Sequence, residues 1–351
     1  MIGRPRSLVE PHLRKPRDFE TEYDAEITAI AFSEAGTLAA TLGDGSVQLI
    51  APDDKVRAVQ VHDGAALCLA VDIDGQGFVS GGDDGRMVRT TPDGSTFELL
   101  SAPGRQLDVL AVSRPANARA VAIGREVRLL DPTGAVRARA SGHPSTVSGL
   151  AFNPKGKRLA VAHYGGVTLW WTATLGGTPQ RLDWRGSHIG VTWSPDGAYV
   201  MTTMQECELH GWRLADGESM AMSGYAAKVR SMDWLAKPAW LATAGADSVI
   251  TWPFTGSGPQ GKAPVELCRC IGRLVTRVAV HPKRPLVAAG FDDGRVAVCD
   301  LPSEPDSSIF PVRPSGGGRV TALAWSRDGT RLAIGTDGGA LSIFDLAKPA
   351  S

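Results

Sequence analysis

The chain has 351 residues, of which 43% are hydrophobic and 21% charged, and lysine plus arginine balance aspartate plus glutamate at 37 each. This composition is typical of a folded globular protein, and the zero net charge excludes a global field that would draw the chain to nucleic acid or an acidic membrane. No run approaches the roughly 18 apolar residues of a membrane-spanning helix, and residues 1–20 lack a signal-peptide core, so we expect a cytoplasmic protein without membrane contact.

The first predicted element in chain order is a short strand at residues 18–23, after which one strand-like phrase occurs eight times. The copies end at Phe32, Val71, Val112, Phe152, Trp193, Trp234, Val280 and Trp325. The steps between these positions are 39, 41, 40, 41, 41, 46 and 45 residues. A period near forty, with apolar β-forming residues between Gly, Asp and Pro turns, is the signature of a β-propeller.

The last copy, residues 320–346, shows how one repeat divides into strands. Val320 to Trp325 has the apolar and aromatic content of a buried strand, and Ser326-Arg327-Asp328-Gly329 has the composition of a tight turn. A second strand is predicted at 332–335 and a third at 341–344, with a turn at 336–339 between them. Most copies are followed by a shorter polar run, which we predict to be an outer edge strand: 56–61, 96–100, 136–140, 179–184, 219–222, 265–270 and 309–312.

The eighth copy has no outer strand of its own, and the strand at 18–23 has no other blade to join. We therefore predict that residues 18–23 close the ring by pairing with the last blade, which removes an unpaired edge. The expected fold is all-β, an eight-bladed propeller of four-stranded antiparallel blades, with seven blades as the alternative. The expected domains are an N-terminal extension at 1–17, a single propeller at 18–346 and a short tail at 347–351.

Several motifs resemble the WD-repeat (WD40) family across about residues 18–346. These are Gly142-His143 before the fourth copy and the turns Asn153-Pro154-Lys155-Gly156 and Ser194-Pro195-Asp196-Gly197. The family's tryptophan position is filled by Trp in three copies, at Trp170, Trp212 and Trp252.

The resemblance also implies a network of His, Ser or Thr, Asp and Trp in each blade, and no copy has all four residues. The second copy has His62, Ser80 and Asp84, with Thr90 in place of Trp. The fourth has His143 and Trp170, with Tyr164 near the usual Asp. We therefore expect apolar packing to supply most of the blade stability.

The sequence contains no nucleophile elbow, phosphate-binding glycine loop or zinc-protease motif, and no cofactor is predicted. The five cysteines, at 68, 207, 268, 270 and 299, are too few and too irregular for a disulfide framework, so we expect reduced thiols. Cys268 and Cys270 are weak metal candidates, because they lack the paired spacing of structural zinc sites. Asp72-Ile73-Asp74-Gly75 resembles the start of a calcium loop but lacks its later ligands.

The resemblance implies a non-enzymatic scaffold that binds a protein or peptide over one face of the ring. That face, here called the entry-loop face, is built from the loops that enter each first strand and the loops that join second to third strands. Arg, Trp and Tyr anchor many interfaces, and they accumulate there. The predicted partner-binding residues are Arg105, Trp184, Arg185, Tyr225, Lys228, Arg273 and Arg319. The arginines favour an acidic or phosphorylated partner, because guanidinium pairs with carboxylate and phosphate.

The alternative function is a propeller enzyme or metal-handling protein that uses the central channel. Such a site needs titratable groups that converge from several first strands, and the charged candidates inside those strands are Asp108, Asp233 and Arg277. The scaffold is the first hypothesis, and we expect a monomer that works within a larger complex.

Overall fold

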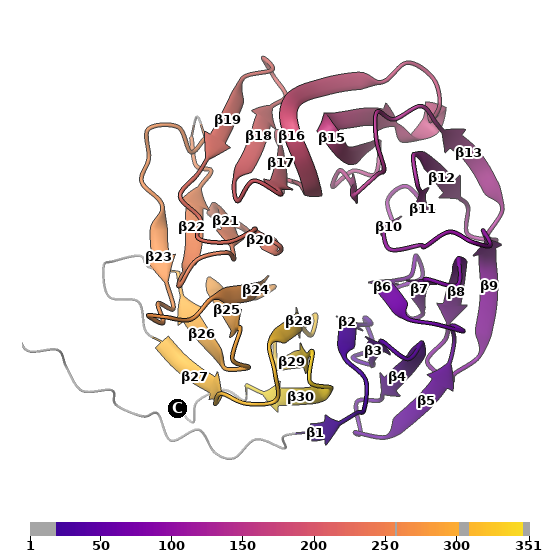
Figure 1. Ribbon diagram of the computed structural model, residues 1–351, viewed down its shortest axis with the longest axis vertical. Helices are drawn as coiled ribbons and strands as arrows, with labels where there is room; N and C mark the ends of the chain where they lie inside the picture. The colour runs from indigo at the N-terminus through magenta and orange to yellow at the C-terminus, as the bar shows by residue number, and fades with distance from the viewer. Residues whose placement is uncertain (1–18, 257, 302–308, 347–351) are drawn as a thin grey trace, which may run out of the picture.

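The computed structural model describes residues 19–256, 258–301 and 309–346. The strands form a ring of sheets around a central opening, and each sheet runs from the opening to the rim (Figure 1). The first strands of the repeats, such as β6 and β24, border the opening, whereas outer strands such as β9 and β27 lie at the rim (Figure 1). The described part of the chain has no helix with the length and apolar character needed to span a bilayer.

Three four-stranded antiparallel blades come first in the chain. The first contains β2 (Ile27–Phe32), β3 (Leu38–Leu42), β4 (Ser46–Ile50) and β5 (Val56–Gln60). The second contains β6 (Ala66–Val71), β7 (Phe78–Gly82), β8 (Arg86–Thr90) and β9 (Thr96–Ser101). The third contains β10 (Leu110–Ser113), β11 (Ala118–Ile123), β12 (Glu126–Leu130) and β13 (Val136–Ala140). The second and third strands are mostly buried and the outer strands mostly exposed, as the polarity of their sequences predicts.

The fourth and fifth repeat copies share one sheet of six strands. Its elements are β14 (Gly149–Phe152), β15 (Arg158–Trp171), a 3-10 turn (Thr172–Thr174), β16 (Gln180–Trp193), β17 (Tyr199–Met204), β18 (Leu209–Arg213) and β19 (Ser219–Met222). Both β15 and β16 have 14 residues. The outer part of β16 pairs with β15 and its inner part pairs with β17, so one ladder continues from the first of these copies into the second.

The prediction of eight separate blades is therefore wrong, and the structure has the seven blades of the alternative. The physical reason lies in the turn chemistry of the fourth copy. In four other copies an Asp-Gly turn, such as Asp84-Gly85, separates the second and third strands. Here Tyr164-Gly165-Gly166 takes that place, and the chain passes it as an irregularity within β15. Positive φ angles of 91° and 137° at Gly165 and Gly166 allow this path.

The ring closes as the sequence predicts. The last three sheets are β20–β23, β24–β27 and β28–β30, and β1 (Phe19–Glu22) pairs antiparallel with β30, so that Phe19 faces Ile343 and Glu22 faces Ala340. Their strands are β20 (Met232–Ala236), β21 (Ala239–Thr243), β22 (Val249–Pro253), β23 (Val265–Leu267), β24 (Val275–Val280), β25 (Leu286–Phe291), β26 (Val296–Asp300), β27 (Ile309–Arg313), β28 (Val320–Trp325), β29 (Arg331–Thr336) and β30 (Ala340–Asp345). The predicted extension at 1–17, Asp18 and the predicted tail at 347–351 lie outside the described residues.

Neighbouring blades pack face to face through apolar clusters. Between the last and first blades, Ile27, Leu38 and Leu341 are fully buried in one such cluster. First-strand tryptophans add hydrogen bonds between the first strands of successive repeat copies. The indole Nε1 of Trp193 donates to Ala151 O at 2.9 Å, and that of Trp325 donates to Ala279 O at 3.0 Å. The repeat position therefore joins adjacent first strands as well as filling the core.

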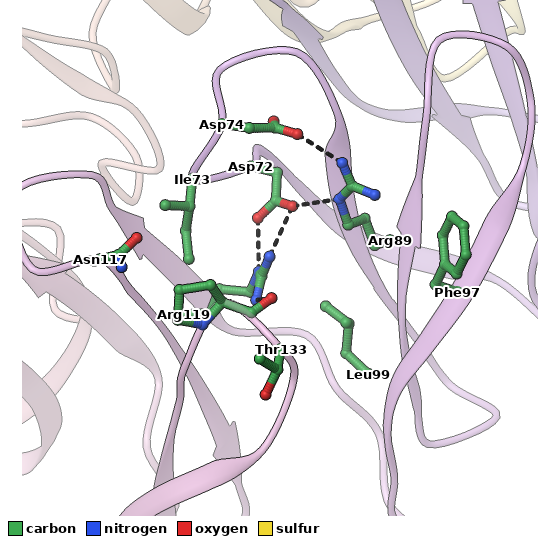
Figure 2. A pocket seen from close by; sticks show the side chains of 10 residues that line it. Asp72, Ile73, Asp74, Arg89, Phe97, Leu99, Asn117, Arg119 and Thr133 are labelled. Carbon is green, nitrogen blue, oxygen red and sulfur yellow. Dashed lines mark hydrogen bonds and ion pairs between the residues drawn. The ribbon is translucent and has the colours of Figure 1, made fainter.

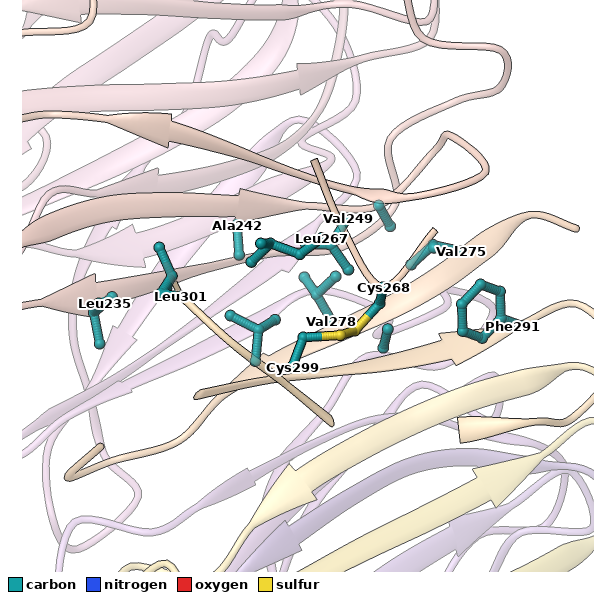
Figure 3. Close-up of a cluster of buried hydrophobic side chains, with 13 residues drawn as sticks. Leu235, Ala242, Val249, Leu267, Cys268, Val275, Val278, Phe291, Cys299 and Leu301 are labelled. Atoms are coloured by element: carbon teal, nitrogen blue, oxygen red, sulfur yellow. A yellow bond between two sulfur atoms is a disulfide. The ribbon is translucent and has the colours of Figure 1, made fainter. Parts of the chain in front are cut away.

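A disulfide joins Cys268 and Cys299 inside the cluster between the β20–β23 and β24–β27 blades (Figure 3). The expectation that all five cysteines are reduced is wrong for this pair. The Cα atoms are 5.9 Å apart, within the range that a disulfide requires. The predicted outer strand at 265–270 also ends earlier, at Leu267, because Cys268 has a positive φ of 53° that turns its side chain into the core.

Partial polar networks supplement the apolar packing. His62 contacts Asp84 through Nδ1 at 3.1 Å and Ser80 through Nε2 at 2.8 Å. In the fourth copy, Trp170 Nε1 donates to His143 Nε2 at 3.1 Å. The degenerate copies thus keep those parts of the family network that their residues permit.

Candidate partner-binding site

A cavity of about 600 Å³ lies on the entry-loop face, at the inner edge of the ring. Its walls come from β24 and β28, from the loops that precede β2, β20, β24 and β28, and from the turns at Cys207 and Asp337. Four basic side chains line it: Lys228, Arg230, Arg277 and Arg319. Of the predicted partner-binding residues, Lys228 and Arg319 are therefore brought to one place, together with two arginines that were not on that list.

The cavity has more cationic than anionic side chains. Its only lining carboxylates among the described residues are Glu26 and Asp337. Asp337 is engaged by Arg319, whose backbone N–H donates to Oδ1 at 2.7 Å and whose Nε donates to Oδ2 at 3.2 Å. Within the described part of the chain, Lys228 and Arg230 have no ion-pair partner within 4.0 Å. The cavity therefore keeps a net positive charge.

Arg277 is the deepest of the four cations, because it belongs to β24 itself. Its half-buried guanidinium donates through Nε to Thr321 O at 2.5 Å and through Nη1 to Thr276 O at 3.0 Å. No described carboxylate forms an ion pair with it. Burial lowers the pKa of Arg277, and repulsion by Arg230 and Arg319 lowers it further. An anion in this cavity would remove that repulsion.

Three of the other predicted residues are exposed and lie outside the cavity. Arg105 is solvent-exposed in the loop between β9 and β10, whereas Arg185 is exposed within strand β16 and not in an entry loop as predicted. The ring of Trp184 is 39% exposed and stacks on His210, with centroids 3.8 Å apart and an interplanar angle of 16°. Burial, followed by the neighbouring His188, lowers the pKa of His210 to about 4, so the stack is between two neutral rings at neutral pH. Trp184 is therefore held in a fixed orientation with one face accessible.

The last two predicted residues are engaged within the fold. Tyr225 is only 8% exposed, and its hydroxyl accepts from Trp252 Nε1 and contacts Thr243 Oγ1, both at 2.8 Å. It takes the role that His has in the family network, so its side chain is not available to a partner. Arg273 pairs with Asp293 at 3.3 Å, and the same carboxylate also pairs with Arg295 at 2.9 Å.

Among the groups proposed for a channel enzyme or metal site, Asp233 and the two cysteines are engaged within the fold. Both carboxylate oxygens of Asp233 accept backbone N–H groups, from Trp234 at 2.8 Å and Val280 at 2.7 Å. The sulfur of Cys268 is in the disulfide, and Cys270 Sγ lies 3.1 Å from Arg295 Nη1. Over residues 19–256, 258–301 and 309–346, no group of three or more His, Cys, Asp or Glu could hold a metal ion.

The calcium-like motif is part of an ion-pair network on the other side of the blades (Figure 2). Arg119 Nε and Nη2 bond Asp72 Oδ1 and Oδ2 at 2.6 and 2.8 Å. Arg89 bonds Asp72 at 2.7 Å and Asp74 at 2.6 Å. The two carboxylates therefore serve as partners for two arginines, and their charges balance.

Two protein-family descriptions match parts of the chain that lie on its repeats. The family described as WD domain, G-beta repeat, matches residues 54–88 and 135–171, and the family described as anaphase-promoting complex subunit 4 WD40 domain matches residues 274–350. These matches fall on the blades of a closed propeller ring. Together with the seven-bladed ring, these matches support a WD40 β-propeller family for the chain. WD40 propellers generally mediate protein interactions, and most are not enzymes.

Among solved structures, this WD40 propeller is similar to the computationally designed Ika8 protein, with a TM-score of 0.72 and 20% sequence identity. The match covers 92% of this chain and 97% of the designed one, and at this identity it concerns the fold alone. None of the curated proteins compared with the chain matches it.

Sequence reasoning missed Arg230 and placed Arg277 with the enzyme alternative. The sequence positions of these two arginines were the signal that could have identified them as cavity residues. Arg230 follows the predicted entry residue Lys228 by two, and Arg277 was recognised as a charge inside a first strand. The sequence does not show that these two lie beside Arg319, because the three residues come from different blades.

Proposed function

We propose that this WD40 propeller is a non-enzymatic scaffold that binds an acidic segment of a partner protein across its entry-loop face. The cation-rich cavity carries the proposal. Lys228, Arg230, Arg277 and Arg319 face one space of about 600 Å³ that has only two described carboxylates, one of them already paired. Guanidinium and ammonium groups in such an enclosed place attract carboxylates more strongly than they do in open solvent.

Predicted residues that are exposed outside the cavity are compatible with the same function. Trp184 offers an aromatic face that its stack on His210 holds in place, so little side-chain entropy is lost when a partner packs against it. Arg105 is exposed in the loop before β10, and Arg185 is exposed within β16. Because the whole protein has no net charge, this local excess gives specificity for acidic segments rather than general attraction to polyanions.

An array of short peptides that vary in acidic content tests the proposal. We expect the intact protein to retain a subset of Asp- and Glu-rich peptides, with retention that falls as salt is raised. The double substitution Lys228→Ala and Arg230→Ala removes two cations without breaking a described ion pair, so it should abolish retention and leave the melting temperature unchanged.

The matched control removes two exposed cations from the rim. Arg57 on β5 and Arg139 on β13 are exposed and form no described ion pair, so Arg57→Ala with Arg139→Ala makes the same change in net charge. Retention should survive in this control. If no acidic peptide is retained, or if the two double variants lose retention equally, the entry-loop face is not the binding surface.

A further inference from the structure

We propose that the cavity beside Arg277 is a receptor for a phosphate group, and that the partner segment presents a phosphorylated side chain there. This inference rests on the proposed function and narrows it from acidic segments in general to phosphorylated ones. It depends on three features of the cavity: the unpaired guanidinium of Arg277, the cations beside it, and the exposed carboxylate of Glu26.

The guanidinium of Arg277 has unused hydrogen-bonding capacity that faces the cavity. Two of its nitrogens, Nε and Nη1, donate to backbone carbonyls, whereas Nη2 makes no hydrogen bond with any described residue. Because Arg277 lines the cavity, Nη2 is placed to donate to a ligand there. The backbone bonds hold the guanidinium in one orientation, so a ligand does not bear the entropic cost of ordering it.

The surrounding charges favour a doubly charged ligand over a single carboxylate. Lys228 and Arg230 lack described ion-pair partners, and Arg230 and Arg319 are close enough to Arg277 to depress its pKa. One carboxylate would neutralise one of three unpaired cations. A phosphorylated side chain carries about −1.5 to −2 charges at neutral pH and three acceptor oxygens, so it can engage several donors at once.

The threonines of the cavity do not compete as donors. Thr276 Oγ1 donates to Val320 O at 2.8 Å and Thr321 Oγ1 donates to Ile27 O at 2.5 Å, so both hydroxyl protons are used within the ring. Recognition must therefore come from the basic side chains, which makes binding sensitive to ligand charge.

Glu26 supplies a substitution that should improve binding. Its side chain is exposed at the cavity, and no described residue forms an ion pair with it. A carboxylate at this position repels a dianion more than a monoanion. The variant Glu26→Gln should therefore tighten binding of a phosphorylated ligand about two- to fivefold, the range of surface charge effects.

The test compares three forms of each peptide retained on the array, with phosphoserine, serine or glutamate at one central position, by fluorescence polarisation. We expect the phosphoserine form to bind the intact protein about tenfold more tightly than the glutamate form, a difference of about 1.4 kcal/mol. Inorganic phosphate should displace the phosphoserine peptide competitively. Arg277→Gln should remove the preference for phosphoserine over glutamate. Arg230→Ala should reduce this preference, and because Arg230 is exposed its substitution should not disturb folding.

The outcomes separate the two proposals. If acidic peptides bind but phosphoserine gives no advantage over glutamate, the phosphate receptor is refuted while the scaffold proposal stands. If inorganic phosphate protects the protein from thermal unfolding but no peptide binds, the cavity is an anion site and the scaffold proposal is refuted. If Arg230→Ala leaves the phosphoserine preference intact, or Glu26→Gln weakens it, the cation cluster is not the receptor.

Discussion

Two clusters of charged residues in this propeller use the same side chains to opposite effect. In the cluster of Figure 2, Arg89 and Arg119 face Asp72 and Asp74, and every one of these groups has an ionic partner at 2.6–2.8 Å. In the entry-face cavity, four cations lie beside two described carboxylates, and no described carboxylate pairs with Arg277. The two cavities are similar in size, about 540 and 600 Å³.

The difference between the clusters is the number of acceptors, not the number of arginines. The charge of a buried arginine that is paired with a carboxylate is already compensated within the fold. Such a pair can hold adjacent blades in register, as Arg119 does with Asp72 of the preceding blade. An arginine that is hydrogen-bonded only to backbone carbonyls has an uncompensated charge, which can pair with an anionic ligand. Substitutions in the balanced cluster should therefore lower the stability of the protein, whereas substitutions in the entry-face cavity should lower ligand binding.

The largest expected effect is the removal of the central acid in the balanced cluster. The side chains of Asp72 and Arg119 are 1% and 3% exposed, so Asp72→Ala leaves a buried guanidinium without its counter-ion. We expect the free energy of unfolding to fall by about 3–5 kcal/mol, measured by urea denaturation. The control is Asp337→Ala, which breaks an ion pair with the mostly exposed Arg319 and should cost less than about 1 kcal/mol. Equal losses in both variants would remove the distinction between the clusters.

A second effect concerns Asp233, a carboxylate without a cation partner among the described residues and so the counterpart of Arg277. Burial raises the pKa of Asp233 to about 6 from its usual 3.8, although two backbone N–H groups oppose the shift. Because the folded protein holds this proton more tightly than the unfolded chain, the group is destabilising once it ionises. Stability attributable to Asp233 is complete below about pH 4 and is lost as pH rises to about 6.

The measurement is the free energy of unfolding of the wild-type protein relative to Asp233→Asn at several pH values. The difference should shift against the wild type by up to about 3 kcal/mol between pH 4 and pH 7, because each pKa unit corresponds to about 1.4 kcal/mol. The Asn variant controls for other titrating groups. A difference that is constant with pH would show that the pKa of Asp233 is not raised in the folded state.

Much of the fold could be predicted from the sequence, because the propeller repeat depends on local pattern. The eight phrase ends all fall on strands, from Phe32 at the end of β2 to Trp325 at the end of β28, and the strand at 19–22 closes the ring. The blade count could not be obtained in the same way. It depends on whether the chain at Tyr164 turns or continues, and the glycines that follow are compatible with both.

The site was less predictable, because it depends on contacts between blades. Tyr225 has the composition of an interface anchor, and only the packing shows it bonded to Thr243 and Trp252 in the core. Cys268 and Cys299 are 31 residues apart, and their pairing follows from the approach of two blades. The cavity itself joins residues from loops as distant as Glu26 and Arg319. Residue type predicted which side chains could bind a partner. Which of them are accessible to a partner depends on the packing of the blades.

The smallest expected effect on stability is that of Arg277→Gln, which tests whether the two clusters differ in the role of their arginines. Arg277→Gln removes a guanidinium that has no ionic partner, so the two lost hydrogen bonds should be offset by relief from burial and from repulsion by Arg230 and Arg319. We expect the free energy of unfolding to change by less than about 1 kcal/mol. The matched variant Arg119→Gln removes the bidentate partner of the buried Asp72, which keeps only Arg89, and should cost about 3–5 kcal/mol. Urea denaturation of both variants under one condition checks this. If Arg277→Gln costs as much as Arg119→Gln, then Arg277 is needed to hold β24 to β28, and its charge is not kept for a ligand.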